Sequence, residues 1–181
     1  MSTAFLASIP IDGLDPSRLW PHVPAEVRKL AAHSLYARDR EDPAARQLAD
    51  AFIARALRFR EVAVRKLPLD RRVEYLTRAV RPDDSLASSL LLALHMANRR
   101  PMLSAFLDAL GVPHDNGAIS DAPHLARQPK DRLETAAKRL LAAFPEEDVE
   151  IYLASLLAMD PTIWGSLAGV LEELRRGESS T

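Results

Sequence analysis

Hydrophobic residues recur along most of the chain at intervals of three and four, which is the period of an amphipathic α-helix. Aspartate-proline pairs and prolines followed by carboxylates mark helix starts, because proline fits the first turn and negative charge suits the helix dipole. Gly111 and Gly177 follow apolar stretches and predict helix C-terminal caps. Eight helices are predicted, or nine if the short first turn is counted: 16–20, 24–38, 43–66, 69–80, 83–99, 101–110, 131–143 and 145–176, the last divided at Asp160-Pro161.

No segment has the alternation and β-branched enrichment of a strand. The links between the predicted helices are short, and short links favour antiparallel neighbours. We therefore expect an all-α fold, either an antiparallel multi-helix bundle or a short α-helical stack. A length of 181 residues fits one domain or at most two small ones, and we expect a single all-α domain, 1–181.

The predicted helix 83–99 is apolar around most of its circumference, so we expect it at the centre of the fold. Its polar residues Ser88, His95 and Arg99 follow one another at spacings of seven and four. Those spacings place the three side chains on one continuous strip of the helix. The strip is a candidate binding surface.

The segments 69–110 and 131–176 resemble each other in outline. Each has an amphipathic helix, then a helix that starts at proline followed by two acidic residues, then a third helix that starts at proline. A duplication of this kind implies two stacked three-helix units, as in helical repeat proteins. The alternative is a coincidence between two stretches rich in alanine and leucine.

The composition contains 29 Ala and 28 Leu but only 6 Gly and no Cys. It excludes a disulfide scaffold and disfavours a β-sandwich. No apolar run is long enough to cross a membrane, and the N-terminal residues lack the features of a secretory signal. We therefore expect a cytoplasmic protein.

Arginine outnumbers lysine 20 to 4, which suggests a GC-rich bacterial genome.

The motifs of common enzyme classes are missing from the sequence. There is no glycine-rich phosphate loop, no HExxH and no GxSxG, and the absence of cysteine removes thiol catalysis and cysteine-based metal sites. We therefore predict no catalytic residue, no cofactor and no metal, and we lean away from an enzyme.

The longest stretch without helical pattern is 111–129, and long loops in helical domains are often functional. Within it, His114, Asp115 and Asn116 precede a glycine, and the Asn-Gly pair predicts a tight turn with positive φ. Together with Ser88, His95 and Arg99 these three residues form the candidate binding set. A polar pocket near them, in a small helical hydrolase or ligand-binding protein, is the alternative to an interaction module.

Charge is unevenly distributed along the sequence. Residues 51–82 hold nine basic and three acidic residues, whereas residues 144–181 hold two basic and eight acidic residues. The favoured interpretation is that the two regions attract each other, within the fold or between subunits. The second is a basic surface for an anionic partner. Its candidate residues are Arg55, Arg58, Arg65, Arg71 and Arg78.

A pI near 6.5 and the lack of a helix-turn-helix pattern disfavour nucleic acid as the partner.

Gly165 and Gly169 lie on one side of the last predicted helix, where glycine lowers helix stability. A close contact across a homodimer would compensate for that loss. From these features we expect a non-enzymatic protein–protein interaction module or adaptor that binds a protein partner. The partner could be a second copy of the chain, which would make the protein a homo-oligomer. A nucleic-acid-associated regulator that uses residues 55–81 is a further alternative.

Overall fold

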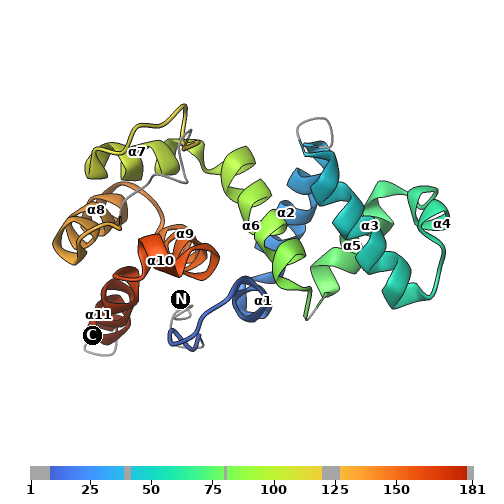
Figure 1. Cartoon of the computed structure of the whole chain (residues 1–181), viewed down its shortest axis with the longest axis horizontal. Helices are drawn as coiled ribbons and strands as arrows, with labels where there is room; N and C mark the ends of the chain where they lie inside the picture. The colour runs from blue at the N-terminus through green and yellow to red at the C-terminus, as the bar shows by residue number, and fades with distance from the viewer. Residues whose placement is uncertain (1–8, 39–41, 80, 120–126, 179–181) are drawn as a thin grey trace. The chain divides into compact units, whose positions relative to one another are not determined.

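The computed structural model describes residues 9–38, 42–79, 81–119 and 127–178 (Figure 1). Within these ranges most residues are in helices that pack on one another and none is in a β-strand, so the predicted all-α class is confirmed. The helices are α1 (Pro16–Leu19), the 3-10 helix η2 (Trp20–His22), α2 (Ala25–Ala37), α3 (Pro43–Leu57), α4 (Glu61–Arg65), α5 (Leu69–Arg78), α6 (Asp84–Asn98), α7 (Arg100–Leu110), α8 (Lys130–Ala143), α9 (Glu146–Met159), α10 (Pro161–Trp164) and α11 (Leu167–Glu178).

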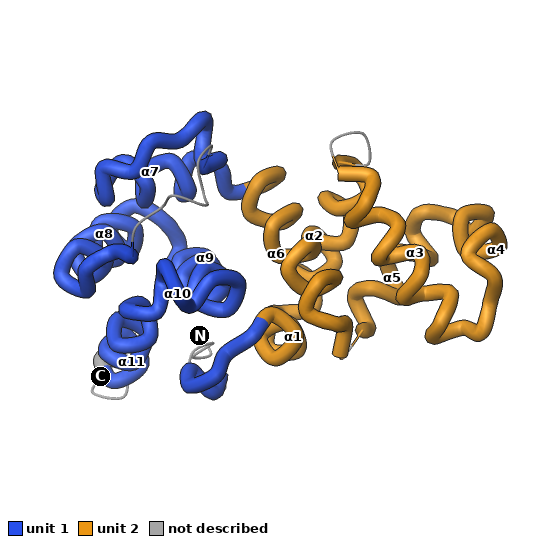
Figure 2. Tube along the Cα trace, in the orientation of Figure 1, with its two compact units in different colours: residues 1–15, 99–181 blue, residues 16–98 orange. Residues whose placement is uncertain are grey.

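The helices are grouped in two compact units (Figure 2). Unit 1 contains residues 1–15 and 99–181, and unit 2 contains residues 16–98. The division falls between α6 and α7, inside the first copy of the repeat that the sequence suggests. The predicted duplication and the single-domain organisation stay predictions.

In unit 2, α6 packs against α1, α2 and α3. This position explains its apolar circumference, since Leu86, Leu90 and Leu94 are all fully buried. Trp20 is also fully buried, and its indole N–H donates a hydrogen bond to the carbonyl of Ala79 at 3.1 Å. A buried indole needs such an acceptor. Trp20 is therefore a core residue of unit 2.

In unit 1, α8 packs against α7, α9 and α11. Three aromatic rings, one each from α7, α9 and α10, lie close together in this unit. Phe106 lies edge-on to Tyr152, with ring centroids 5.5 Å apart, and 6.0 Å from the ring of Trp164. Edge-to-face contacts of this kind add to the stabilisation that apolar burial gives. Aromatic rings therefore form part of the core of unit 1, and Glu150 and Ser155 of α9 are buried there as well.

The single helix predicted over 43–66 is wrong, because the chain leaves the helix at Arg58. This residue has a left-handed backbone (φ 55°), and the N–H of Phe59 bonds back to the carbonyl of Ala54 at 2.9 Å. Gly111 ends α7 in the same way (φ 68°), as predicted. Glycine is the usual residue at this position, and an arginine gives no such signal in the sequence.

The predicted break at Asp160-Pro161 is confirmed, and the Asp160 carboxylate accepts hydrogen bonds from the N–H groups of the next helix, α10. A second, unpredicted break follows at Gly165. A Cβ atom at this position would lie 2.5 Å from the carbonyl oxygen of Pro161, so the turn needs glycine. Gly177 is not a cap, because α11 continues to Glu178.

Gly169 lies against α8. A Cβ atom there would come within 3.0 Å of the Lys130 side chain, whose ammonium pairs with Glu173 at 2.7 Å and with Glu134 at 3.1 Å. The missing side chain lets the lysine stem lie on α11. The close approach at this glycine is therefore made within unit 1, while a homodimer contact stays a prediction.

Candidate functional site

The turn predicted at residues 114–117 is present. Asn116 and Gly117 both have positive φ, 47° and 83°. The residues on either side, Asp115 and Ala118, exchange two backbone hydrogen bonds of 2.8 and 2.9 Å. This is the two-residue turn that Asn-Gly favours.

Polar contacts hold the turn on α7. The N–H of Gly117 donates to Nδ1 of His114 at 3.1 Å, so the ring proton is assigned to Nε2, which lies 3.1 Å from the Asp108 carboxylate. Arg100 donates to the carbonyl of Asn116 at 3.2 Å. The candidate residues of this loop thus have local partners that fix its conformation.

Arg99 is the N-cap residue of α7 and is only 8% exposed. Its guanidinium pairs with the carboxylate of Asp148 and also approaches that residue's carbonyl. Burial lowers the pKa of Arg99, and the negative charges of Asp148 and Glu147 oppose that shift. The arrangement ties α7 to the start of α9 within unit 1.

Ser88 and His95 lie on α6 in unit 2, where Ser88 is half-buried and His95 is 2% exposed. Arg99, His114 and Asp115 belong to unit 1. The residues of the predicted pocket therefore belong to two different units. The pocket stays a prediction.

Most arginines of the predicted basic surface have acidic neighbours. Arg71 and Arg78 flank Glu74 on α5, at 3.1 and 2.7 Å. Arg55 lies 3.8 Å from Asp83. Exposed pairs of this kind contribute little to stability, but they offset positive charge locally.

The segment 55–66, which links the end of α3 to α4, is the most exposed part of this surface, and we call it the basic corner. It carries five cations, Arg55, Arg58, Arg60, Arg65 and Lys66, and a single acidic residue, Glu61. Two large apolar side chains in the same segment are also exposed, Phe59 at 51% and Val62 at 63%. Charge and apolar surface therefore coincide in the basic corner.

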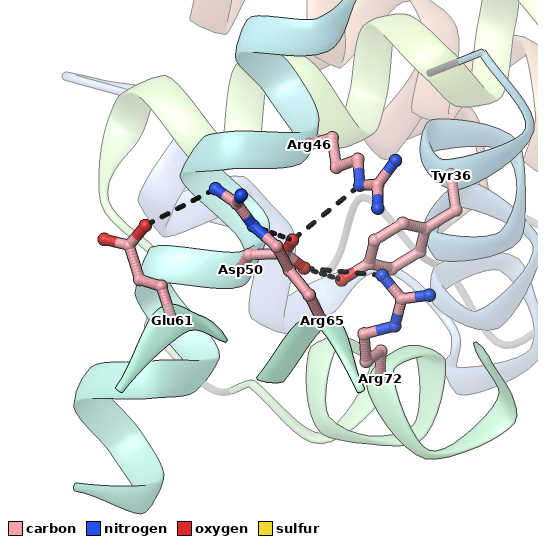
Figure 3. A network of polar contacts seen from close by, with 6 residues as sticks. All are labelled: Tyr36, Arg46, Asp50, Glu61, Arg65 and Arg72. Carbon is pink, nitrogen blue, oxygen red and sulfur yellow. Dashed lines mark hydrogen bonds and ion pairs between the residues drawn. The ribbon is translucent and has the colours of Figure 1, made fainter. Parts of the chain in front are cut away.

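A buried carboxylate lies between the helices of unit 2 (Figure 3). Asp50, on α3, is 1% exposed. Tyr36 donates its hydroxyl to this carboxylate at 3.2 Å, and three guanidinium groups approach it, those of Arg46 at 3.7 Å, Arg65 at 3.8 Å and Arg72 at 3.6 Å. We call these five residues the Asp50 cluster. A buried carboxylate needs such partners.

Tyr36 acts in the cluster as a hydrogen-bond donor. Burial raises the pKa of its hydroxyl, as does the negative charge of Asp50, while Arg72 and Arg46 oppose the shift. The phenol therefore stays protonated at neutral pH. Because a general base or nucleophile must give up its proton, Tyr36 is suited to holding Asp50 in place and not to catalysis.

Arg72 is held by two contacts, neither of which is a hydrogen bond. Its guanidinium carbon lies 4.6 Å from the centre of the Tyr36 ring, and its contact with Asp50 is an ion pair too long for a hydrogen bond. Nε and Nη1 of Arg72 are buried and have no hydrogen-bond partner among the described residues. Buried donors without acceptors are unfavourable, so this side chain stands out.

A pocket of about 480 Å³ opens beside the cluster. Residues of α2, α3, α5 and α6 line it, and all of them belong to unit 2. We call it the arginine pocket, after its two arginines. Its lining residues are His33, Ser34, Tyr36, Ala37, Arg46, Leu69, Arg72, Ala97 and Asn98.

Sequence reasoning missed the Asp50 cluster. The available signal was a carboxylate among the inward-facing residues of α3, because Ala49, Ile53 and Ala54 beside it are all buried. An acidic residue in such a stripe implies nearby cations. Which cations these are depends on helix packing that the helical period does not specify.

No protein-family model, curated protein or solved structure matches the chain. In the part of the chain that the structure describes, no three acidic or histidine side chains gather where they could hold a metal ion. None of the described helices combines the length and apolarity needed to cross a membrane. The candidate sites therefore rest on their own geometry.

Proposed function

We propose that the chain is a non-enzymatic interaction module that binds an acidic, partly apolar segment of a partner protein through unit 2. One observation carries the proposal: among the described residues, every large apolar side chain that is exposed belongs to unit 2. These side chains are Leu30, Leu48, Phe59, Val62, Leu69, Tyr75 and Leu92. Exposed apolar surface concentrated on one part of a protein commonly marks an interaction site.

The charge of unit 2 favours an acidic partner. Residues 16–98 contain fifteen basic and ten acidic side chains, a net charge of +5. Opposite charge speeds association and discriminates among partners, while burial of apolar side chains supplies affinity. An acidic segment with interspersed apolar residues would satisfy both requirements.

The basic corner is the part of unit 2 best suited to this contact. Phe59 and Val62 offer apolar area, and arginine and aromatic residues are those that most often dominate the energy of protein interfaces. Glu61, the acidic residue of the segment, is already 3.9 Å from Arg65. An incoming carboxylate therefore meets mainly positive charge.

The test is fluorescence anisotropy of the full chain with labelled peptides. A peptide of alternating Glu and Leu is expected to bind saturably and more weakly as salt is raised, because exposed charges are screened. Peptides of alternating Lys and Leu, or of Glu and Ser, serve as charge and apolar controls. Val62→Ser and Arg58→Glu are each expected to weaken binding about tenfold.

Leu92→Ser is the matched control, because Leu92 is exposed (44%) on α6, outside the basic corner. It should leave affinity unchanged. Equal binding of the Lys-Leu peptide, or equal weakening by Leu92→Ser, would contradict the proposal. Tighter binding of a thymidine oligonucleotide than of the Glu-Leu peptide would replace it with nucleic-acid recognition.

A further inference from the structure

We propose that the arginine pocket binds a small organic oxyanion, a carboxylate or phosphate group attached to an apolar body. The nine residues that line the pocket lie outside the basic corner, so this site is distinct from the protein-binding surface proposed above. Its walls are positively charged, two nitrogens of one arginine lack hydrogen-bond partners among the described residues, and its size suits a small molecule.

Among the described residues that line the pocket, positive charge exceeds negative charge. Arg46 and Arg72 line it, and none of its lining residues is acidic. The carboxylate of Asp50 is not a lining residue, and its single negative charge faces three cations, Arg46, Arg72 and Arg65. Arg65 also lies 3.9 Å from the carboxylate of Glu61.

Arg72 supplies the donors. A guanidinium carries five N–H groups in a planar fork that matches the oxygens of a carboxylate or phosphate. Two of its nitrogens are buried and lack hydrogen-bond partners among the described residues. Contact with the Tyr36 ring holds the plane of the guanidinium in place. Arg72 lines the pocket, so an oxyanion bound there would lie beside this guanidinium.

The remaining walls complete the site. Asn98 donates to the Ser34 hydroxyl at 2.7 Å, which places a polar pair on the pocket wall beside His33. Leu69 and two alanines supply apolar surface. The volume of about 480 Å³ is within the range of small-molecule sites and leaves room for more than one oxyanion group. An apolar body would fill that room.

A neighbouring cavity shows why the charge argument is specific to the arginine pocket. It has a volume of about 510 Å³ and shares His33, but Asp70 and Glu74 line it together with Lys29 and Arg78. Its acidic and basic side chains balance. Of these two similar cavities, only the arginine pocket has walls that favour an anion.

The experiment is NMR observation of the arginine Nε–Hε signals in the full chain, with the Arg72 signal assigned from the Arg72→Lys variant. The probes are sodium phosphate, sodium benzoate and sodium chloride at matched ionic strength. Phosphate or benzoate is expected to shift the Arg72 signal saturably, below about 10 mM, and chloride is not. A shift by phosphate alone assigns a phosphate ligand, and a shift by benzoate alone assigns a carboxylate on an apolar body.

Calorimetry of the variants provides the second readout. Arg72→Lys keeps the positive charge but loses the planar fork, so we expect the affinity for the effective probe to fall about tenfold or more. Arg71→Lys is the control, because Arg71 precedes it on α5 and pairs with Glu74. The absence of a saturable shift with either oxyanion, or equal weakening by both variants, would overturn the proposal. Neither result depends on peptide binding at the basic corner.

Discussion

Unit 1 gathers aromatic rings where α7, α9 and α10 meet, whereas unit 2 encloses a carboxylate between a phenol and three guanidinium groups. Unit 1 also carries nine basic and fifteen acidic side chains, a net charge of −6, against +5 for unit 2. Unit 1 also buries a carboxylate, Glu150 on α9, so the contrast lies in the aromatic rings and in the net charge. The packing of aromatic rings needs only area and shape. A buried charge needs each of its partners in place, and an excess of cations around it is available to a ligand.

Each unit contains a buried tyrosine whose hydroxyl has a raised pKa, and the causes differ. For Tyr152 in unit 1 the cause is burial alone. For Tyr36 in unit 2 the negative charge of Asp50 and a hydrogen bond to it add to the effect of burial. The raised pKa of Tyr36 thus reflects a polar network as well as burial.

The largest expected effect is on the aromatic core of unit 1. Phe106→Ala should lower the free energy of unfolding by about 3–5 kcal/mol, because it removes a fully buried ring and leaves a cavity. Urea unfolding followed by circular dichroism measures the change. Leu92→Ala, at an exposed position, is the control and should change stability by about 0.5 kcal/mol or less. A loss of less than about 1 kcal/mol for Phe106→Ala would show that the rings do not form a tight core.

The second effect concerns the polar network of unit 2. Asp50→Ala should lower stability by about 2–3 kcal/mol, less than for a wholly enclosed pair, because Arg46 and Arg65 reach solvent. The double variant Asp50→Leu, Arg72→Met should regain part of that loss, since it removes a buried cation together with its counter-charge. Urea unfolding again provides the measurement. A double variant less stable than Asp50→Ala would contradict this account of the cluster.

The smallest expected effect is on the contribution of the two buried tyrosines, Tyr36 and Tyr152, to stability. Because both pKa values are raised by folding, the folded chain holds these protons more tightly than the unfolded chain. Their contribution to stability is present below the unfolded pKa of about 10 and is lost as pH rises above it. Tyr36→Phe should cost about 1 kcal/mol at neutral pH and make the fall above about pH 10 shallower.

Tyr152→Phe should likewise make the alkaline fall shallower, but it leaves the Asp50 cluster intact. The informative comparison is a double-mutant cycle with Asp50→Asn, measured by urea unfolding near neutral pH. Tyr36→Phe and Asp50→Asn should be non-additive, because the two side chains share a hydrogen bond. Tyr152→Phe and Asp50→Asn should be additive. Equal coupling for both tyrosines would remove the distinction between the units.

Local signals in the sequence predicted much of the fold. Asp42 and Asp160 before proline each begin a helix and cap it with the side chain, as expected from the pairs. Asn116 and Gly117 form the expected turn. In each of these cases the residues that decide the structure are adjacent, so the chemistry is readable without knowledge of the fold.

The arginine pocket and the Asp50 cluster could not be predicted in this way. Tyr36, Asp50 and Arg72 lie on α2, α3 and α5, and only helix packing brings them together. The sequence pattern indicated that residues 51–82 were basic, but not which arginines would be enclosed beside a carboxylate. Contacts between side chains far apart in sequence depend on interhelical geometry, which the hydrophobic period alone does not determine.

Arg58, the left-handed residue at the end of α3, affects both the stability of the fold and the charge of the basic corner. Glycine would adopt the backbone of Arg58 with less strain, so that substitution should favour the folded state. It would also remove a cation from the basic corner. A lineage under selection for thermal tolerance alone would drift toward glycine at this position, whereas one that depends on an anionic partner would keep the strained arginine.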